Sequence, residues 1–389
     1  MFMGQNSRTM KVHAPTPLLG GLSPSAFMQT HWQRKPLLVR QAIPGFSALL
    51  SRTALFELAT RTEVESRLVI GDLGGQRDWQ LQRGPFKRRA FPKFSERDWT
   101  LLVQGVDLHH DAVADLMQRF RFVPDARLDD VMISYATDGG GVGPHFDSYD
   151  VFLLQAQGRR RWRIGRQKTL ALKPGLPLKI LDRFEPEHDW VLEPGDMLYL
   201  PPGYAHEGTA VGECMTYSIG FRVPQTGDLA RELLARLSDD APQQLGEDLY
   251  RDAGQPAVTR AAEIPSAMQA FARDVLERAS GDPMALARAL GEYLTEPKAQ
   301  VWFEAQPRPR RLRAVALDRR SRMMYDRHHV FLNGESWRAA GADARLMRRL
   351  ADARGLTAQD LAQASPEALD LLRDWCADGW LQPQPLSRD

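Results

Sequence analysis

One stretch, from Val131 to Asp147, constrains the fold of this chain more than any other. It begins with an apolar run that predicts a strand, continues through a loop with four glycines, and ends in His145-Phe-Asp147. Residues two apart on a strand project to the same face, so we expect the imidazole and the carboxylate to converge. His206 follows a second apolar strand and a Pro-Pro-Gly-Tyr-Ala turn, and it offers a third ligand. Two histidines and one carboxylate form the facial triad of non-haem Fe(II) oxygenases, although a zinc hydrolase also keeps an open coordination position.

The segment Arg159-Arg-Arg-Trp-Arg-Ile164 predicts a strand with one apolar face. By alternation, Arg160 shares that face with Trp162 and Ile164, so its guanidinium is expected to point inward. An inward cation is costly unless it meets an anion, and a carboxylate bound by both arms of the guanidinium is the natural partner. We therefore expect Arg160 to bind the carboxylate of a 2-oxo acid, with Ser134 as a further hydrogen-bond donor. Alternatively, Arg160 pairs with an aspartate or glutamate of the protein. Ser134 is equally well explained as an ordinary strand residue without a role in binding.

The pattern of the chain changes twice, which predicts an α+β protein with three parts. Short strands with Gly and Pro turns between residues 131 and 223 favour an antiparallel barrel or jelly roll, and we assign residues 1–224 to this domain. Helical patterns follow, and Met268, Phe271 and Val275 form an apolar face on one of them, so residues 225–297 are predicted to be a helical segment. Strand-like pieces and three short helices suggest a winged-helix-like domain over residues 298–389.

Composition limits the location and the class of the protein. The chain of 389 residues has two cysteines, which fits a reducing cytoplasm and excludes a zinc site of four thiolates. It has no apolar run of bilayer length and no apolar core of a signal peptide near its start, so we expect a cytoplasmic protein without membrane contact.

The net charge of +2 makes nucleic acid an unexpected primary ligand. Eight arginines between Arg308 and Arg327, against Asp318 and Asp326, nevertheless form a basic run. A nucleic-acid-binding regulator with a cupin sensor domain is therefore one alternative function.

Three motifs resemble those of a known family, the JmjC/cupin-like ribosomal oxygenases. They are Gly141-Val-Gly-Pro-His-Phe-Asp147, Gly158-Arg-Arg-Arg-Trp162 and Tyr199-Leu-Pro-Pro-Gly-Tyr-Ala-His206. The upstream Trp32-Gln-Arg-Lys-Pro36 is also similar to that family. The chain looks most like the bacterial branch, which hydroxylates an arginine of a large-subunit ribosomal protein.

The resemblance implies a double-stranded β-helix that uses Fe(II) and 2-oxoglutarate. It implies that His145, Asp147 and His206 bind the metal and that Arg160 and Ser134 bind 2-oxoglutarate, with no separate catalytic residue. It further implies a ribosomal protein as the partner, a homodimer built by the helical segment, and a winged-helix-like C-terminal domain.

The substrate is less constrained by the residues. Arginine carries five donors and no acceptor, so its pocket needs acceptors. Asp138 in the glycine loop is a candidate contact, and closure of the Thr-Asp-Gly turn is its alternative role. A histidine-directed ribosomal hydroxylase stays open as an alternative. A cupin enzyme that needs no 2-oxo acid also stays open, although an inward Arg160 argues against it.

Overall fold

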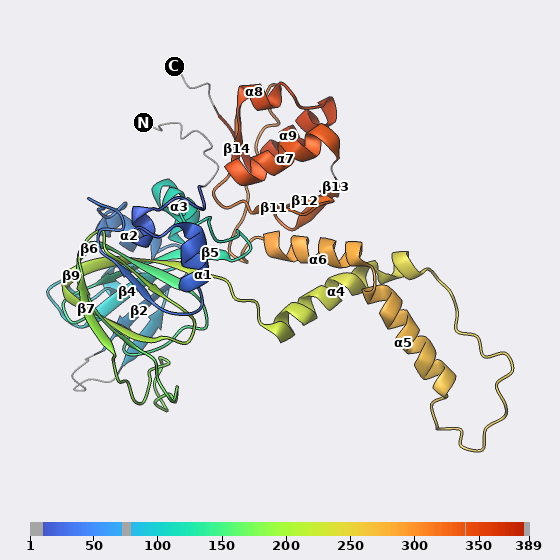
Figure 1. Cartoon of the computed structure of the whole chain (residues 1–389), viewed down its shortest axis with the longest axis horizontal. Helices are drawn as coiled ribbons and strands as arrows, with labels where there is room; N and C mark the ends of the chain where they lie inside the picture. Colours follow the sequence, from blue (N-terminus) through green and yellow to red (C-terminus); the bar gives the residue numbers. More distant parts are fainter. Residues whose placement is uncertain (1–10, 72–78, 339, 385–389) are drawn as a thin grey trace. The chain divides into compact units, whose positions relative to one another are not determined.

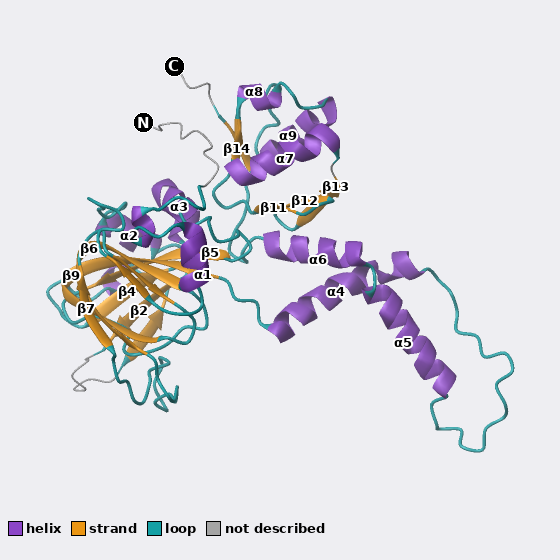
Figure 2. Cartoon of the chain, in the orientation of Figure 1, coloured by secondary structure: helices purple, strands orange, loops and turns teal. Residues whose placement is uncertain are grey.

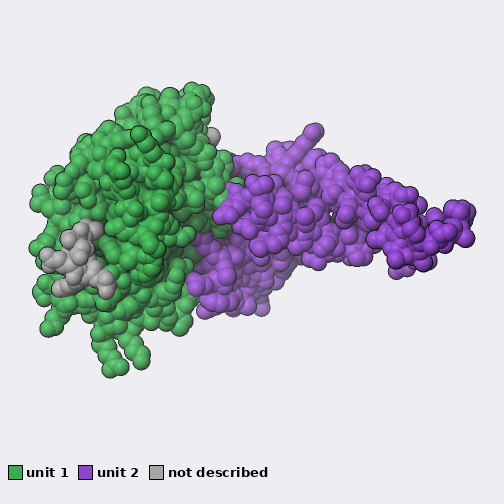
Figure 3. Space-filling model, turned by 90° about the horizontal axis from the view of Figure 1, so that it is seen from below, with its two compact units in different colours: residues 1–223 green, residues 224–389 purple. Residues whose placement is uncertain are grey.

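The computed structural model describes residues 11–71, 79–338 and 340–384. The chain divides into two compact units, residues 1–223 and residues 224–389 (Figure 3). Residues 225–297 and 298–389 fall in the same unit, so the division into three domains stays a prediction. The first ten residues, where we expect no signal peptide, lie outside the described part.

Strands dominate the first unit, and within the described residues nine of them form one antiparallel sheet (Figure 2). The order is β1-β8-β6-β9-β5-β4-β2-β3, and β7 pairs with β6. The strands are β1 (Leu37–Val39), β2 (Ser66–Ile70), β3 (Gln80–Arg83), β4 (Trp99–Val103), β5 (Leu128–Ala136), β6 (Val151–Gly165), β7 (His188–Leu192), β8 (Met197–Leu200) and β9 (Ala205–Phe221).

Three short α-helices accompany the sheet: α1 (Pro24–Thr30), α2 (Arg52–Leu58) and α3 (Asp111–Gln118), with 3-10 turns at Pro17–Leu19, Arg88–Ala90 and Val106–Leu108. The sequence places their ends by local rules. Ser23 caps α1 by accepting a hydrogen bond from the amide of Ala26 at 3.1 Å, and Pro24 occupies the first helical position, where its missing N–H costs nothing. Phe27 of α1 is fully buried beside Phe152 and Tyr199, so this helix closes one end of the aromatic core.

The long strands β6 and β9 pair along most of their length and carry the residues of interest. Alternation is visible in β6, where Arg160, Trp162 and Ile164 are buried while Arg159 and Arg161 are exposed. The inward face assigned from the sequence to Arg160, Trp162 and Ile164 is therefore confirmed.

The second unit begins with α4 (Thr226–Leu245), α5 (Ser266–Ser280) and α6 (Pro283–Thr295) (Figure 1). Leu237 of α4 packs against Ala285 and Ala289 of α6 in a small apolar cluster. By contrast, no side chain of α5 is buried. This helix therefore gains little stability from contacts within the described chain.

Two small antiparallel sheets and three further helices complete this unit. The sheets have the orders β14-β10-β15 and β11-β12-β13. The elements are β10 (Val315–Leu317), β11 (Met323–Tyr325), β12 (His329–Leu332), β13 (Glu335–Arg338), α7 (Gly341–Ala353), β14 (Gly355–Leu356), α8 (Ala358–Leu361), α9 (Pro366–Ala377) and β15 (Leu381–Pro383). Ser365 caps α9 by accepting a hydrogen bond from the amide of Ala368 at 3.0 Å, and Pro366 occupies the first helical position. Trp375 and Leu350 lie in the shared core.

No helix in the described residues is both long enough and apolar enough to cross a membrane.

Candidate metal centre

The glycine loop brings His145 against the start of β9. His145 and His206 form an isolated antiparallel bridge, in which each backbone N–H donates to the other residue's carbonyl, at 2.9 and 2.8 Å. The loop can approach β9 this closely because glycine, which lacks a side chain, occupies the point of contact. A Cβ on Gly141 would lie 2.5 Å from the carbonyl oxygen of Gly208, which only glycine avoids.

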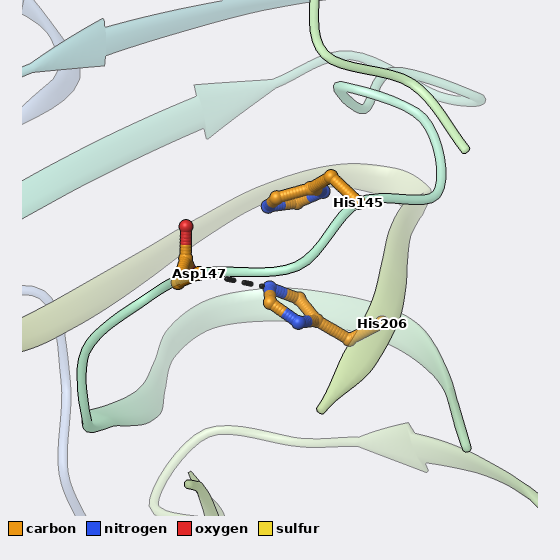
Figure 4. Close-up of side chains that lie close together, drawn as sticks. All are labelled: His145, Asp147 and His206. Atoms are coloured by element: carbon orange, nitrogen blue, oxygen red, sulfur yellow. Dashed lines mark ion pairs between the residues drawn. The ribbon is translucent and has the colours of Figure 1, made fainter. Parts of the chain in front are cut away.

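Three side chains converge at this bridge: His145, Asp147 and His206 (Figure 4). Their ligand atoms all lie within 4.8 Å of one another, and they form the one such group found among the described residues. The two imidazole centroids are 4.3 Å apart, and Nε2 of His206 is 3.6 Å from Oδ2 of Asp147. The structure thus brings together the three residues that the sequence pattern selected.

Backbone carbonyls hold both imidazoles in the tautomer that a metal needs. Nδ1 of His145 lies 2.9 Å from the carbonyl oxygen of Gly143, and Nδ1 of His206 lies 3.0 Å from that of Tyr204. A carbonyl oxygen only accepts, so each Nδ1 carries the proton and each Nε2 keeps its lone pair. Burial, and then the neighbouring His145, lower the pKa of His206 to about 4, so this ring is neutral at physiological pH.

Arg160 is a buried cation without a carboxylate partner in the described residues. Its Nη1 donates to the hydroxyls of Ser134 at 2.9 Å and Thr216 at 3.3 Å, and its Nη2 approaches the carbonyl oxygen of Gly208 at 3.4 Å. Its Nε has no hydrogen-bond partner, and burial lowers the pKa of the guanidinium. A buried cation with a free donor is the arrangement that an anionic ligand completes.

Trp162 links this cation to the metal ligands. The Arg160 guanidinium lies 5.4 Å from the Trp162 ring, and that ring lies 5.9 Å from the imidazole of His206. Gly208 opposite leaves room for both, because a Cβ there would meet the indole at 2.7 Å and Nε of Arg160 at 3.0 Å. The residues present therefore fit a small dicarboxylate that spans from Arg160 to a metal.

The sequence reasoning missed Thr216 and Gln155. Thr216 pairs in register with Ser134 on β5 and with Gln155 on β6, and its hydroxyl donates to Oε1 of Gln155 at 2.9 Å. The resulting polar row lies next to Arg160. Alternation on β9 gave a signal for an inward Thr216, but its neighbours depend on strand register, which the sequence does not specify.

Asp138 is not among the clustered ligand atoms. Its carboxylate accepts from Nη2 of Arg97 at 2.9 Å and from the backbone N–H of Gly212 at 2.8 Å. The contact with Gly212 fastens the glycine loop to β9, and the contact with Arg97 fastens it to the segment before β4. A role of Asp138 in binding substrate stays a prediction.

Asp150, three residues after the metal-ligand Asp147, is fully buried in a structural network. It accepts hydrogen bonds from the Tyr199 hydroxyl at 2.6 Å, from the Gln33 amide group at 3.1 Å and from Nη2 of Arg127 at 3.3 Å. Its carboxylate is thus engaged by protein donors.

Two family models match this chain. The JmjC domain matches residues 115–229, and the ROXA-like winged helix matches residues 276–382. Among characterised sequences, the ribosomal protein uL16 3-hydroxylase of Escherichia coli K12 is 39% identical over 288 residues, which are 73% of this chain and 74% of that protein. A probable ribosomal oxygenase of Haemophilus influenzae is 29% identical and covers 92% of this chain and 96% of its own length.

Solved structures agree with this result over most of the chain. The X-ray structure of E. coli ycfD superposes with a TM-score of 0.80 at 33% identity, covering 92% of this chain and 96% of that one. The complex of E. coli YcfD with cobalt and 2-oxoglutarate superposes with a TM-score of 0.79 at 32% identity, covering 93% and 98%. The predicted jelly-roll domain and winged-helix-like C-terminal domain are thereby confirmed. The chain belongs to the JmjC-domain family of ribosomal oxygenases.

Proposed function

We propose that this protein hydroxylates an arginine of the large-subunit ribosomal protein uL16, using Fe(II) and 2-oxoglutarate. The observation that carries the proposal is the buried guanidinium of Arg160. It pairs with no carboxylate in the described part of the chain, and the Trp162 ring lies between it and His206, one of three clustered metal-ligand side chains. The inward Arg160 argues against a cupin enzyme that needs no 2-oxo acid, because such an enzyme has no co-substrate carboxylate for this cation to bind.

The relatives support the same chemistry. The E. coli relative is named for 3-hydroxylation of uL16, and its structures hold cobalt with either 2-oxoglutarate or succinic acid. These two acids are the co-substrate and the co-product of a reaction that oxidises 2-oxoglutarate to succinate and carbon dioxide.

Each site residue has a defined task in this proposal. His145 and His206 would hold Fe(II) through Nε2, and Asp147 would hold it through its carboxylate. The bound iron supplies the activation of dioxygen. Arg160 would bind the distal carboxylate of 2-oxoglutarate, with the hydroxyls of Ser134 and Thr216 beside it.

Contacts between side chains of neighbouring strands orient the residues that would bind the co-substrate. Ser134 and Thr216 fix one end of the Arg160 side chain, and Trp162 fills the space between Arg160 and His206. The co-substrate would therefore enter a site whose donors are already oriented, so little side-chain freedom is lost on binding.

The test is mass spectrometry of a uL16 fragment incubated with the protein, Fe(II), 2-oxoglutarate and oxygen. We expect a gain of one oxygen on an arginine and none on the same fragment with lysine at that position, because lysine lacks the planar fork. A His145→Ala variant serves as the matched inactive control. Oxygen found on a histidine, with no arginine product, would instead favour the histidine-directed alternative.

The helical segment 225–297 supports a further assignment, that of a homodimer interface. On α5, Leu276 is 69% exposed and Met268 is 44% exposed, and on α4 Leu234 is 59% exposed. Apolar side chains left open on neighbouring helices suit a two-fold contact, the commonest form of assembly. An enzyme that modifies a bacterial ribosomal protein would work in the cytoplasm, and we assign it there.

A further inference from the structure

A cationic pocket lies in the second unit, apart from the metal ligands in sequence and in domain. It has a volume of about 670 Å³ and is formed by the turn between β11 and β12, the end of β13 and the start of α7. Its charged lining consists of Arg327, Arg338, Arg345 and Arg348, joined by His328. The remaining lining residues carry no charge, so the pocket is positive without any acidic group of its own.

The arginines of this pocket form no ion pairs with carboxylates in the described part of the chain. Within the described part of the chain, Arg327, Arg338 and Arg345 are exposed and make no ion pair. Arg348 donates from Nη2 to the carbonyl oxygen of Arg327 at 2.8 Å, and no carboxylate pairs with it there.

The acidic residues beside the pocket are already engaged. Asp326 accepts from the amides of His328 and His329, both at 2.6 Å. Asp343 accepts from the hydroxyl of Ser365 at 2.7 Å.

The basic run between Arg308 and Arg327 differs from the pocket because two of its arginines form ion pairs. Arg308 pairs with Asp370 and Asp374, and Arg320 pairs with Asp318. The charge of these two arginines is thus compensated, whereas Arg327 at the end of the run lines the pocket.

The helix-turn-helix geometry of this unit does not favour readout of bases. In such motifs the second helix enters the major groove of DNA. Here that helix is α9, and it exposes Glu367, Asp370 and Asp374 to solvent. Because Arg308 and Arg373 are paired with two of these carboxylates, the face has no surplus of positive charge to attract a phosphate backbone.

The lining of the pocket indicates which anion it suits. A protein partner needs a buried apolar or aromatic anchor, and Met284 is the one large apolar side chain among the lining residues. Guanidinium groups instead match phosphate oxygens with two parallel hydrogen bonds. Several unpaired arginines around an open concavity are therefore suited to consecutive phosphates of a nucleic-acid strand.

We propose that this cationic pocket binds the phosphate backbone of RNA. The choice of RNA rests on the proposed function, since a ribosomal protein substrate is found beside ribosomal RNA. Binding there holds the enzyme near its substrate without reading a base sequence, because the pocket offers charge and no base-specific contact.

The test uses the full-length protein and a fluorescent RNA duplex, with fluorescence anisotropy followed across a salt series. The variant combines Arg338→Gln with Arg345→Gln. We expect its affinity at about 50 mM salt to fall by roughly 10-fold or more, and its salt slope to become shallower by about two, one for each lost phosphate contact. The matched control combines Arg311→Gln with Arg313→Gln, two exposed arginines of the same unit outside the pocket.

The same proteins are assayed for hydroxylation of an isolated uL16 fragment. We expect unchanged rates in both double variants, because the affected residues are far in the chain from the metal ligands. RNA binding equal to that of the unaltered protein, or an equal loss in the control, would overturn the pocket assignment. Failure of the proposed function has a different signature, namely no hydroxylation of the fragment by the unaltered protein while RNA binding persists.

Discussion

Nη1 of Arg160 donates a hydrogen bond to the hydroxyl of Ser134 at 2.9 Å, and this contact joins β6, the strand after His145 and Asp147, to β5, the strand before them. The glycine loop and its ligands lie between these two points in the chain. The Arg160 side chain, which would bind the co-substrate, therefore also ties together the two strands that flank His145 and Asp147. Changes at either residue are expected to affect both functions.

Loss of a metal ligand should separate iron binding from folding. Asp147→Ala should abolish turnover and lower the iron content measured by elemental analysis, because two imidazoles alone hold the metal poorly. The carboxylate is 22% exposed, so its removal should leave the melting temperature nearly unchanged. Full activity in this variant would remove Asp147 from the ligand set.

Because Arg160 points inward and Arg161 points outward, substitutions at the two positions should affect 2-oxoglutarate binding differently. Arg160→Ala should weaken 2-oxoglutarate binding by about 2–5 kcal/mol, or roughly 30-fold or more in the apparent KM, because the carboxylate loses its buried partner. Arg161→Ala should have little effect, since Arg161 is exposed and pairs with Asp189 on the neighbouring strand. Steady-state assays of succinate formation compare the two, and greater damage in the Arg161 variant would contradict the assignment.

The proposed dimer interface is tested on α5. Leu276→Asp should shift the protein to a monomer in sedimentation experiments, because a carboxylate would be buried against the partner. Phe271 is the weaker choice, since its ring also packs against Tyr250 at 5.3 Å within the chain. Glu277→Gln next to it is the control for general effects on the helix, and a dimer that persists with Leu276→Asp would exclude this face.

The buried Asp318 predicts a pH dependence of the second unit. Burial would raise the pKa of Asp318, but the Arg320 side chain and amide outweigh this effect and lower it. A carboxylate with a lowered folded pKa contributes stability above its ordinary pKa of about 3.9, and that contribution is lost as the pH falls through the folded value.

Asp318→Asn should therefore destabilise the second unit by ~2 kcal/mol at neutral pH, a figure reduced for the partial exposure of Arg320. The difference from the unaltered protein should shrink below about pH 4. Urea unfolding at several pH values measures it, with the exposed Asp370→Asn as control. A difference that stays constant with pH would show that the charge of Asp318 is not the cause.

The sequence by itself determined what depends on short-range periodicity. The His-x-Asp spacing selected His145 and Asp147, although the structure places the pair in a loop with an isolated bridge at His145 and not on the expected strand. Alternation of side chains turns Arg160 inward in β6. Helix starts such as Ser23-Pro24 and Ser365-Pro366 follow from hydrogen bonds between residues three apart.

The tertiary structure decided what depends on register between distant strands. Thr216 meets Arg160 only because β9 pairs with both β5 and β6 in one alignment. The carboxylate of Asp150 accepts hydrogen bonds from Tyr199, Gln33 and Arg127. These residues are distant in sequence, so no local sequence pattern predicts them as partners. A one-residue slip would turn every side chain of a strand to its other face, and that choice is made by packing of the whole core.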